Sequence, residues 1–167
     1  MLYFAYGSNL WQPRLECRLG PVRPLGVARL PDYILRWNKL SKKDGSGKCN
    51  IVFLLGSEVL GTAYDIDERK SHVLDDFEGA GFGYKRVNIR VSVKAALIDV
   101  MTYVATSTDD AILPYDWYRD FVIAGARLHG LPVAYIDDLL KQPIKVDEDE
   151  VRASSERLQL ELRPRSA

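Results

Sequence analysis

The stretch LYFAYGSNL, from Leu2 to Leu10, runs an apolar segment directly into a Gly-Ser-Asn turn. The segment Leu2–Ala5 predicts a short buried strand, because its apolar residues are contiguous and end at a turn signal. The residues that follow, Pro13–Leu19, predict a short helix with proline in its first turn. The fold class is predicted from the elements further along the chain.

Strands dominate the first two thirds of the sequence and helices the last third, which predicts an α+β fold built on an antiparallel sheet or barrel. The strongest signal is the strict alternation of apolar residues in YKRVNIRVSV, typical of a half-buried antiparallel strand. The predicted strands after the first are 22–40 (one or two strands with bends), Cys49–Leu55, Glu58–Ile66, Tyr84–Val93 and Leu97–Ala105. The predicted helices after the first are 67–78, capped by Asp67 and ended by Gly79, then Tyr115–His129 and Pro132–Lys141.

Composition narrows the class of protein. The chain has 167 residues, with 23 basic and 23 acidic side chains that cancel and no polybasic run. This balance argues against a nucleic-acid or membrane-surface protein. No apolar stretch approaches the roughly 20 residues of a membrane span, and no signal peptide is recognisable. We therefore expect a cytoplasmic protein with no membrane or nucleic-acid partner.

Cysteine and histidine usage points to a site without metal. Cys17 and Cys49 have no metal-type spacing, and the sequence has only two histidines. The two cysteines could pair, but a cytosolic chain would keep them as thiols. We expect residues 1–142 to form a single domain, with 143–167 as a charged C-terminal extension, peripheral or partly disordered, to which no chemistry is assigned.

The Gly-Ser-Asn turn has two interpretations. In one, Ser8 or Asn9 only caps the helix that follows. In the other, the N–H groups of Gly7, Ser8, Asn9 and Leu10 form a nest that binds a carboxylate or a developing oxyanion, with Gly7 permitting a positive φ and a close ligand. A nucleophilic role for Ser8 is disfavoured, because the G-x-S-x-G pattern is missing and the two histidines occupy ordinary helix positions.

The stretch LDDFEG, from Leu74 to Gly79, offers a candidate for proton transfer. Glu78 closes a predicted helix, so its carboxylate faces the negative end of the helix dipole and has Asp75 as a like-charged neighbour at i−3. Both effects disfavour ionisation, which suits a general acid/base. A solvated acidic helix end is the alternative. The loop after Glu78 contains three glycines and can fold back, which would bring Tyr84 near that carboxylate.

The combination of these motifs resembles the γ-glutamylcyclotransferase family. A YGSN turn, a downstream L-D-x-x-E-G and a G-A-x-x-x-G-L-P segment are hard to obtain together by accident. The likeness covers roughly residues 1–140. It is carried, in the family's order and at compatible spacing, by FAYGSNL (Phe4–Leu10), VARLPDYIL (Val27–Leu35), GTAYDI (Gly61–Ile66), LDDFEG (Leu74–Gly79) and YRDFVIAGARLHGLPVAY (Tyr118–Tyr135).

This resemblance implies a small, mixed, mostly antiparallel β-barrel with peripheral helices. It implies an enzyme of the acyltransferase or lyase type that needs no metal or cofactor and converts a small γ-glutamyl compound into 5-oxoproline. Glu78 matches the family's catalytic glutamate, and Tyr84 and Tyr118 are similar to pocket tyrosines, although the loop before Tyr84 is about one residue shorter than in the animal enzymes. The γ-glutamyl group would be held by the turn residues Tyr6, Gly7, Ser8, Asn9 and Leu10. The family likeness also allows a homodimer.

The expected mechanism follows from the substrate, whose own α-amino group can attack the γ-carbonyl. Glu78 would take the proton from that amine and give one to the departing amine. The turn would bind the α-carboxylate or the oxyanion. We expect the leaving-amine side to be lined by residues such as Phe82, Trp37 or those near Tyr115.

Several substrates and functions are consistent with these motifs. The substrate could be a γ-glutamyl-amino acid, a γ-glutamylamine such as ε-(γ-glutamyl)-lysine, or a biosynthetic intermediate. A glutathione-specific cyclotransferase fits the motifs less well. A non-catalytic module that binds a small carboxylate, and a general amide hydrolase that would release glutamate, are the alternatives from other classes.

Overall fold

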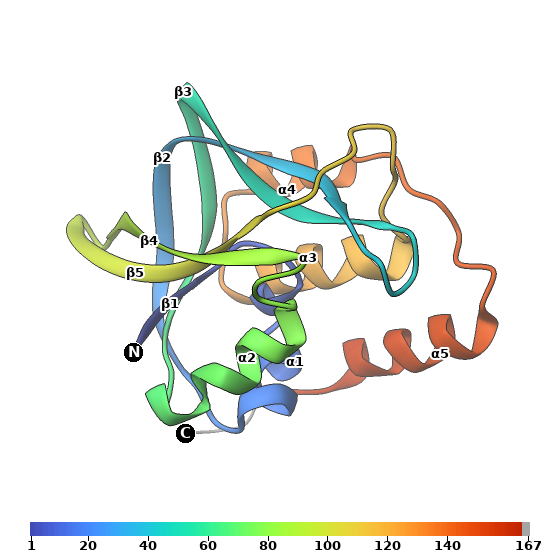
Figure 1. The fold of residues 1–167 in the computed structure, drawn as a ribbon. Coiled ribbons are helices and arrows are strands. Elements are labelled where there is room, and N and C mark those ends of the chain that lie inside the picture. Colours follow the sequence, from blue (N-terminus) through green and yellow to red (C-terminus); the bar gives the residue numbers. More distant parts are fainter. Residues whose placement is uncertain (165–167) are drawn as a thin grey trace.

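A computed structural model describes residues 1–164 and shows a closed, five-stranded β-barrel with helices packed around it (Figure 1). Around the barrel the strands follow the order β1-β3-β2-β4-β5. All pairs of neighbours are antiparallel except β1 and β5, which are parallel and close the barrel. The strands are β1 (Leu2–Ala5), β2 (Arg23–Leu40), β3 (Gly47–Asp65), β4 (Tyr84–Val93) and β5 (Ala96–Ala105). The predicted α+β class and the mostly antiparallel barrel are confirmed.

The short strand β1 lies between two longer neighbours and is enclosed by them. It pairs with β3 over its whole length, and Tyr3 meets Met101 of β5. Phe4 and Ala5 are fully buried. The contiguous apolar residues that predicted this strand are therefore buried on both of its faces. The turn that follows lies at one end of the barrel.

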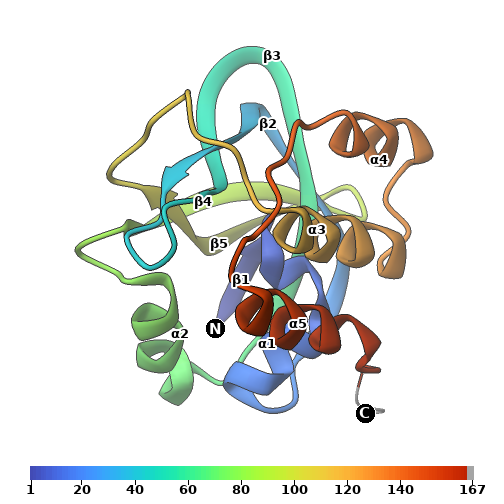
Figure 2. The same cartoon turned by 90° about the vertical axis from the view of Figure 1, so that its right-hand side faces the viewer.

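The helices cover one end and one side of the barrel, as a second view shows (Figure 2). The α-helices are α1 (Gln12–Leu19), α2 (Ser71–Glu78), α3 (Asp116–Leu128), α4 (Val133–Leu140) and α5 (Glu150–Leu158), with 3₁₀ turns η1 (Ser8–Leu10), η2 (Glu68–Lys70) and η3 (Gln159–Glu161). Within residues 1–164, no helix has the length and apolar character needed to cross a membrane.

Helix α3 packs closely on η1 because Gly125 has no side chain. A Cβ placed on Gly125 would lie 2.2 Å from the carbonyl carbon of Leu10 and 2.5 Å from the nitrogen of Trp11. Only glycine allows the two backbones to approach so closely. The G-A-x-x-x-G-L-P segment of α3 thus supports the turn that follows β1.

Two sequence-based predictions of element boundaries are wrong. The predicted strands Cys49–Leu55 and Glu58–Ile66 form one continuous strand, β3, because Gly56 adopts a positive φ of 80° and lets the strand arch over the barrel rather than break. Asp67 caps the 3₁₀ turn η2 by accepting a hydrogen bond from the Arg69 N–H, and α2 begins only at Ser71.

The segment after residue 142 packs against α3 and against Trp11. Its helix α5 buries Ala153, and the indole N–H of Trp11 donates to the Gln159 carbonyl at 3.0 Å. Residues 143–164 of the predicted extension therefore form part of the packed fold, and residues 165–167 lie outside the described residues.

Candidate active site

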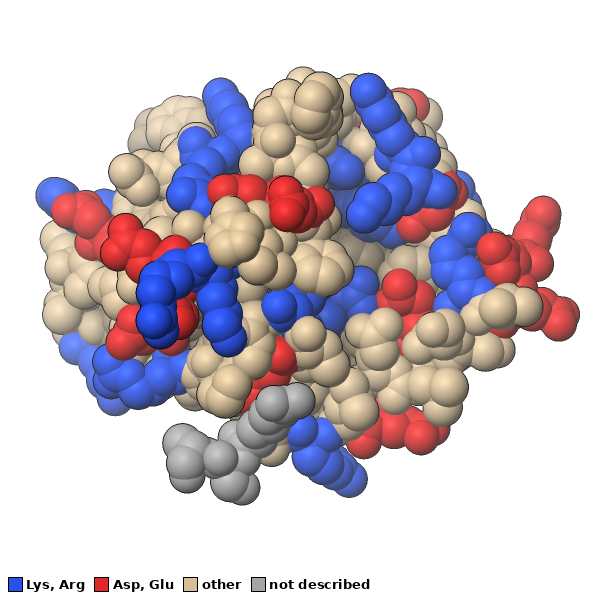
Figure 3. Space-filling model, turned by 60° about the horizontal axis from the view of Figure 1, so that its bottom comes forward, with Lys and Arg blue, Asp and Glu red and all other residues tan. Residues whose placement is uncertain are grey.

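A cavity of about 580 Å³ opens where the β1 turn, the end of α2 and the β2–β3 hairpin loop meet. It shares Ser8, Glu78, Tyr84 and Tyr118 with a small chamber of about 30 Å³. The face presented in Figure 3 is hollowed, with Lys and Arg side chains gathered around the hollow. The chamber is lined by Tyr3, Tyr6, Gly7, Ser8, Asn9, Cys49, Glu78, Tyr84, Tyr103 and Tyr118.

The structure brings all the sequence-predicted polar residues of the site together at this chamber. Glu78 is the last residue of α2, which ends there because Gly79 takes the left-handed conformation with φ 62°. Its side chain is 17% exposed and reaches across to the β1 turn, about seventy residues earlier in the chain. The folded-back glycine loop places Tyr84 in the same chamber, as predicted.

The Glu78 carboxylate is held by two side chains through a single oxygen. Oε1 accepts from Asn9 Nδ2 at 3.0 Å and from Arg18 Nη1 at 3.1 Å. Arg18 Nη1 also donates to Asn9 Oδ1 at 2.8 Å, which ties the three groups to one another. Within residues 1–164 no donor contacts Oε2. Asn9 and Arg18 therefore hold the carboxylate through one oxygen, and the other oxygen has no donor among the described residues.

Asn9 also connects this arrangement to the barrel. Its amide nitrogen donates to the Tyr3 hydroxyl at 2.9 Å, and the side chain is 4% exposed. Asn9 thus acts as a positioning group for Glu78 rather than as a helix cap, because the 3₁₀ turn has no side-chain cap hydrogen bond. Arg18 was not predicted, because α1 places it beside Glu78 only in the folded chain.

Asp75 does not act on Glu78 in the way that the sequence suggested. Its carboxylate accepts from Arg86 Nη2 at 2.7 Å and from the Tyr103 hydroxyl at 2.6 Å. The charge of Asp75 is thus paired with Arg86 on β4. The nearest charged partner of Glu78 is Arg18, with which it forms an ion pair.

The turn after β1 presents three backbone N–H groups rather than the predicted four. The Leu10 N–H donates to the Gly7 carbonyl at 2.9 Å and closes the 3₁₀ turn. Among the described residues, none accepts a hydrogen bond from the N–H of Gly7, Ser8 or Asn9. These three groups are free to bind an anion.

Gly7 is required for a different reason from the one predicted. Its φ is −110°, so no left-handed conformation is involved. A Cβ at this position would lie 3.1 Å from Cys49 Cβ and 3.3 Å from the Tyr118 hydroxyl. Glycine therefore provides space in the chamber rather than backbone freedom.

The tyrosines of the chamber are anchored to the barrel backbone. The Tyr84 hydroxyl donates to the Cys49 carbonyl at 2.7 Å, and the Tyr118 hydroxyl accepts from the Cys49 N–H at 3.0 Å. The Tyr6 hydroxyl donates to the Tyr103 carbonyl. Burial raises the pKa of Tyr6, Tyr84 and Tyr118 well above the usual value. These phenols are therefore neutral. Glu78 brings to the chamber a carboxylate with one oxygen that no donor binds among the described residues.

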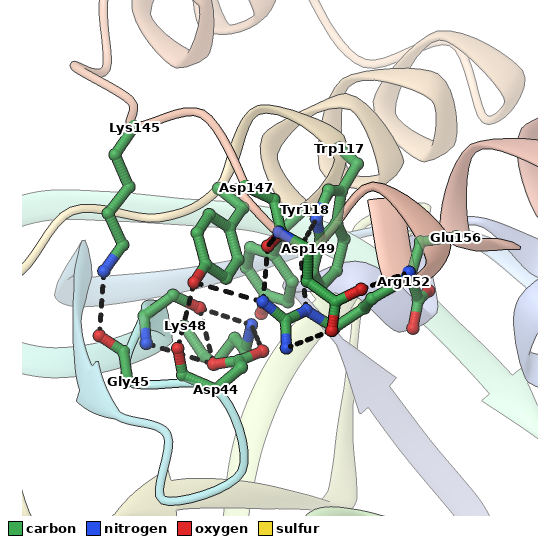
Figure 4. A network of polar contacts seen from close by, with 12 residues as sticks. Asp44, Gly45, Lys48, Trp117, Tyr118, Lys145, Asp147, Asp149, Arg152 and Glu156 are labelled. Carbon is green, nitrogen blue, oxygen red and sulfur yellow. Dashed lines mark hydrogen bonds and ion pairs between the residues drawn. The ribbon is translucent and has the colours of Figure 1, made fainter. Parts of the chain in front are cut away.

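The C-terminal segment contributes to the cavity, which the sequence did not predict. Glu156 and Gln159 line it and bind Arg14 Nη1 at 2.6 Å and 2.9 Å. The segment is fastened by Asp147, whose side chain is fully enclosed and accepts from Trp117 Nε1 at 2.9 Å and from Arg152 (Figure 4). The Arg152 guanidinium lowers the pKa of Asp147 to about 2.

Other candidate chemistries find no support in the geometry. His129 is bound to the Tyr64 hydroxyl at 2.6 Å and does not line the cavity, and neither does His72. In the described part of the chain, no group of His, Cys, Asp and Glu side chains could hold a metal ion. Cys17 and Cys49 are free thiols.

Of the residues expected on the leaving-amine side, some line the cavity and one does not. Phe82 lines the cavity, and so do Trp117 and Tyr118, which are near Tyr115. Trp37 does not line it. Its ring packs edge-to-face against Tyr118, with 6.1 Å between the ring centres, and it lines a separate groove on the outside.

Comparison with known proteins agrees with this fold. The AIG2-like family model matches residues 58–139. Over 144 residues the chain is 33% identical to gamma-glutamylcyclotransferase of Mus musculus and 31% identical to that of Homo sapiens, covering 83% of this chain and 76% of each relative. A solved structure of a gamma-glutamyl cyclotransferase has a TM-score of 0.83 at 26% identity, over 94% of this chain and 98% of that one.

These relatives place the chain among the cyclotransferase enzymes. Within that class, it belongs to the γ-glutamylcyclotransferase family.

Proposed function

We propose that this protein cyclises a γ-glutamyl compound to 5-oxoproline and releases the attached amine. The observation that carries the proposal is the Glu78 carboxylate, held through Oε1 by Asn9 and Arg18 while Oε2 is unbound, beside three free N–H groups. A carboxylate and a set of fixed donors that line the same small chamber suit a proton transfer coupled to oxyanion formation.

The reaction needs no nucleophile from the protein. The α-nitrogen of the substrate attacks the γ-carbonyl carbon, and the bond from that carbon to the departing nitrogen breaks. The α-ammonium loses two protons and the departing nitrogen gains two, so no water is consumed. Glu78 accepts the first proton on Oε2 and returns it to the departing amine, and the second proton passes from the new ring nitrogen to that amine through solvent. The chamber favours the curled substrate by orientation.

The N–H groups of Gly7, Ser8 and Asn9 supply the anion site, for the α-carboxylate or for the oxyanion that develops on the γ-carbonyl. The side chains of Tyr6, Tyr84 and Tyr118 shape the chamber around the γ-glutamyl group, whereas Leu10, predicted with them, lines neither the chamber nor the wider cavity. The wider cavity beyond Tyr84 and Tyr118 receives the departing amine, whose identity is open among amino acids, amines and larger conjugates.

The test is the identity of the product. Incubation with a γ-glutamyl-amino acid should yield 5-oxoproline and the free amino acid in equal amounts. In water enriched in ¹⁸O, the 5-oxoproline should contain no label, because no water enters the reaction. Formation of ¹⁸O-labelled glutamate would identify an amide hydrolase instead, and binding without any product would identify a non-catalytic module.

A further inference from the structure

The wide part of the cavity carries an excess of positive charge. Three carboxylates line it, those of Asp44, Glu78 and Glu156. Six cationic side chains line it, namely those of Arg14, Arg18, Lys39, Lys42, Lys43 and Lys48.

Each of the three carboxylates is already bound to one of these cations. Glu156 binds Arg14 at 2.6 Å and Glu78 binds Arg18 at 3.1 Å. Asp44 binds Lys48 at 2.8 Å, and Lys48 also lies over the rings of Trp117 and Tyr118. These pairs are internal to the protein and leave Lys39, Lys42 and Lys43 without a carboxylate partner within residues 1–164.

Lys39 occupies the position between the wide cavity and the small chamber. Its ammonium lies 5.0 Å from the centre of the Tyr84 ring. The lysine side chain also passes close to Gly83, where an added Cβ would lie 3.1 Å from Lys39 Nζ. Burial lowers the pKa of Lys39, and the charges of Glu78 and Asp44 oppose this shift. A partly desolvated ammonium with only an aromatic partner is a favourable site for an anion.

Lys42 and Lys43 are held near the cavity by a braced loop. Asp44 accepts from the Ser46 N–H at 3.0 Å, and its carbonyl accepts from the Tyr115 hydroxyl at 3.1 Å. From the C-terminal segment, Lys145 donates to the Gly45 carbonyl at 3.0 Å (Figure 4). The loop is thus fastened at Asp44 and Gly45, directly after its two lysines, which line the cavity.

These charges lie on the side of the departing amine. Lys39, Lys42 and Lys43 line the wide cavity but not the small chamber, where the reacting end of a γ-glutamyl substrate would be held. The α-carboxylate and α-ammonium at that end cancel one another. Acidic groups that could pair with the three lysines would therefore lie beyond the γ-amide bond.

Building on the proposed cyclisation, we propose that the departing amine is a polyanion, carrying two or more acidic groups that Lys39, Lys42 and Lys43 bind. A dicarboxylic amino acid and a phosphorylated amine share this chemistry. Net charge complementarity of this kind raises both affinity and the rate of encounter, and it weakens with salt.

The experiment compares substrates that differ in one charged group, and the members of the first pair also have nearly the same shape. The first pair is γ-glutamyl-glutamate and γ-glutamyl-glutamine, and the second is γ-glutamyl-O-phosphoserine and γ-glutamyl-serine. We expect kcat/KM to favour the more acidic member of at least one pair by about tenfold at low salt, as a few partly exposed charges acting together would give. The pair that shows the larger preference identifies the kind of acidic group.

The lysine variants assign that preference to the cavity. In the triple variant Lys39→Met, Lys42→Met and Lys43→Met, the preference should fall below about twofold. The control Lys85→Met removes one exposed charge from β4 outside the cavity, and it should keep both the activity and the preference. A wild-type preference that survives in the triple variant would overturn the assignment.

The outcomes separate this inference from the proposed function. Equal kcat/KM within both pairs, with 5-oxoproline formed from each, would refute the inference and leave the cyclisation intact. Absence of 5-oxoproline from every substrate would refute the cyclisation. In that case calorimetric binding of the same pairs decides the inference, since equal affinities would refute it and about tenfold tighter binding of the acidic member would support it.

Discussion

The contact between α3 and the β1 turn allows a sharp test of how the fold positions the site. Gly125→Ala would place a methyl group 2.2 Å from the carbonyl carbon of Leu10, with no flexible side chain to give way. Carbon atoms in contact normally lie about 3.5–4.0 Å apart, so the helix and the turn must separate by about 1.3 Å or more. Because Asn9 stands on that turn and holds Glu78, the displacement reaches the proposed proton acceptor.

The two consequences of Gly125→Ala can be measured separately. Overpacking costs about 1–3 kcal/mol, against about 1 kcal/mol gained in helix propensity, so urea unfolding should show a net loss of up to about 2 kcal/mol. Misplacing a reacting group by about 1 Å can reduce the rate about 100-fold, so kcat for 5-oxoproline release should fall by that order.

The matched control is Ala124→Gly on the same helix. It should lose about 1 kcal/mol of stability through helix propensity alone and retain the wild-type kcat. A Gly125→Ala protein with wild-type kcat and unchanged stability would refute the conclusion that this contact positions the site. An equal loss of kcat in both variants would show that activity follows stability and not geometry.

Two further predictions concern the groups that hold the site together. Asn9→Ala removes the hydrogen bonds to Tyr3, Arg18 and Glu78, so kcat should fall about 10- to 100-fold with little change in KM, and a wild-type kcat in steady-state assays would contradict the positioning role. Asp147→Asn removes the charge that binds Arg152 and should lower the free energy of unfolding by about 1.5–3 kcal/mol at neutral pH. Arg152 lowers the pKa of Asp147 to about 2. The contribution of the ionised Asp147 side chain to the free energy of unfolding is therefore present above the ordinary aspartate pKa of about 3.9 and is lost as the pH falls towards 2. The stability difference between wild type and Asp147→Asn should therefore narrow over that range, and a constant difference in acid unfolding experiments would contradict this assignment.

Local sequence patterns were sufficient for most of the strands and helices. The alternation in Tyr84–Val93 and the contiguous apolar residues of Leu2–Ala5 predicted β4 and β1 with the observed bounds. The break expected at Gly56 did not occur, because a glycine with positive φ can arch a long strand as well as end one, and the pairing partner decides between these outcomes.

The site could be predicted only in part. Glu78, Tyr84 and the turn after β1 each carry a local signal, and family likeness joined them. Arg18 carries none, because a single arginine on a short helix is ordinary until the fold places it 3.1 Å from Glu78.

The same limit applies to the C-terminal segment and to Asp75. Glu156 and Gln159 belong to a charged segment whose role depends on contacts with Arg14, about 140 residues earlier in the chain. Asp75 was assigned to Glu78 by its spacing on the helix, but β4 supplies Arg86 as a closer partner. Contacts between distant parts of the chain decided both cases.

The role of Glu78 is tested most directly by measuring 5-oxoproline release by Glu78→Gln against Asp76→Asn. Both substitutions remove one acidic charge from α2, but Asp76 is exposed and does not line the cavity. We predict that Glu78→Gln retains the wild-type fold and substrate binding and loses about 1000-fold or more in kcat, since the amide cannot accept the α-ammonium proton, whereas Asp76→Asn keeps the wild-type rate. Near-normal 5-oxoproline release by Glu78→Gln would show that another group moves the proton.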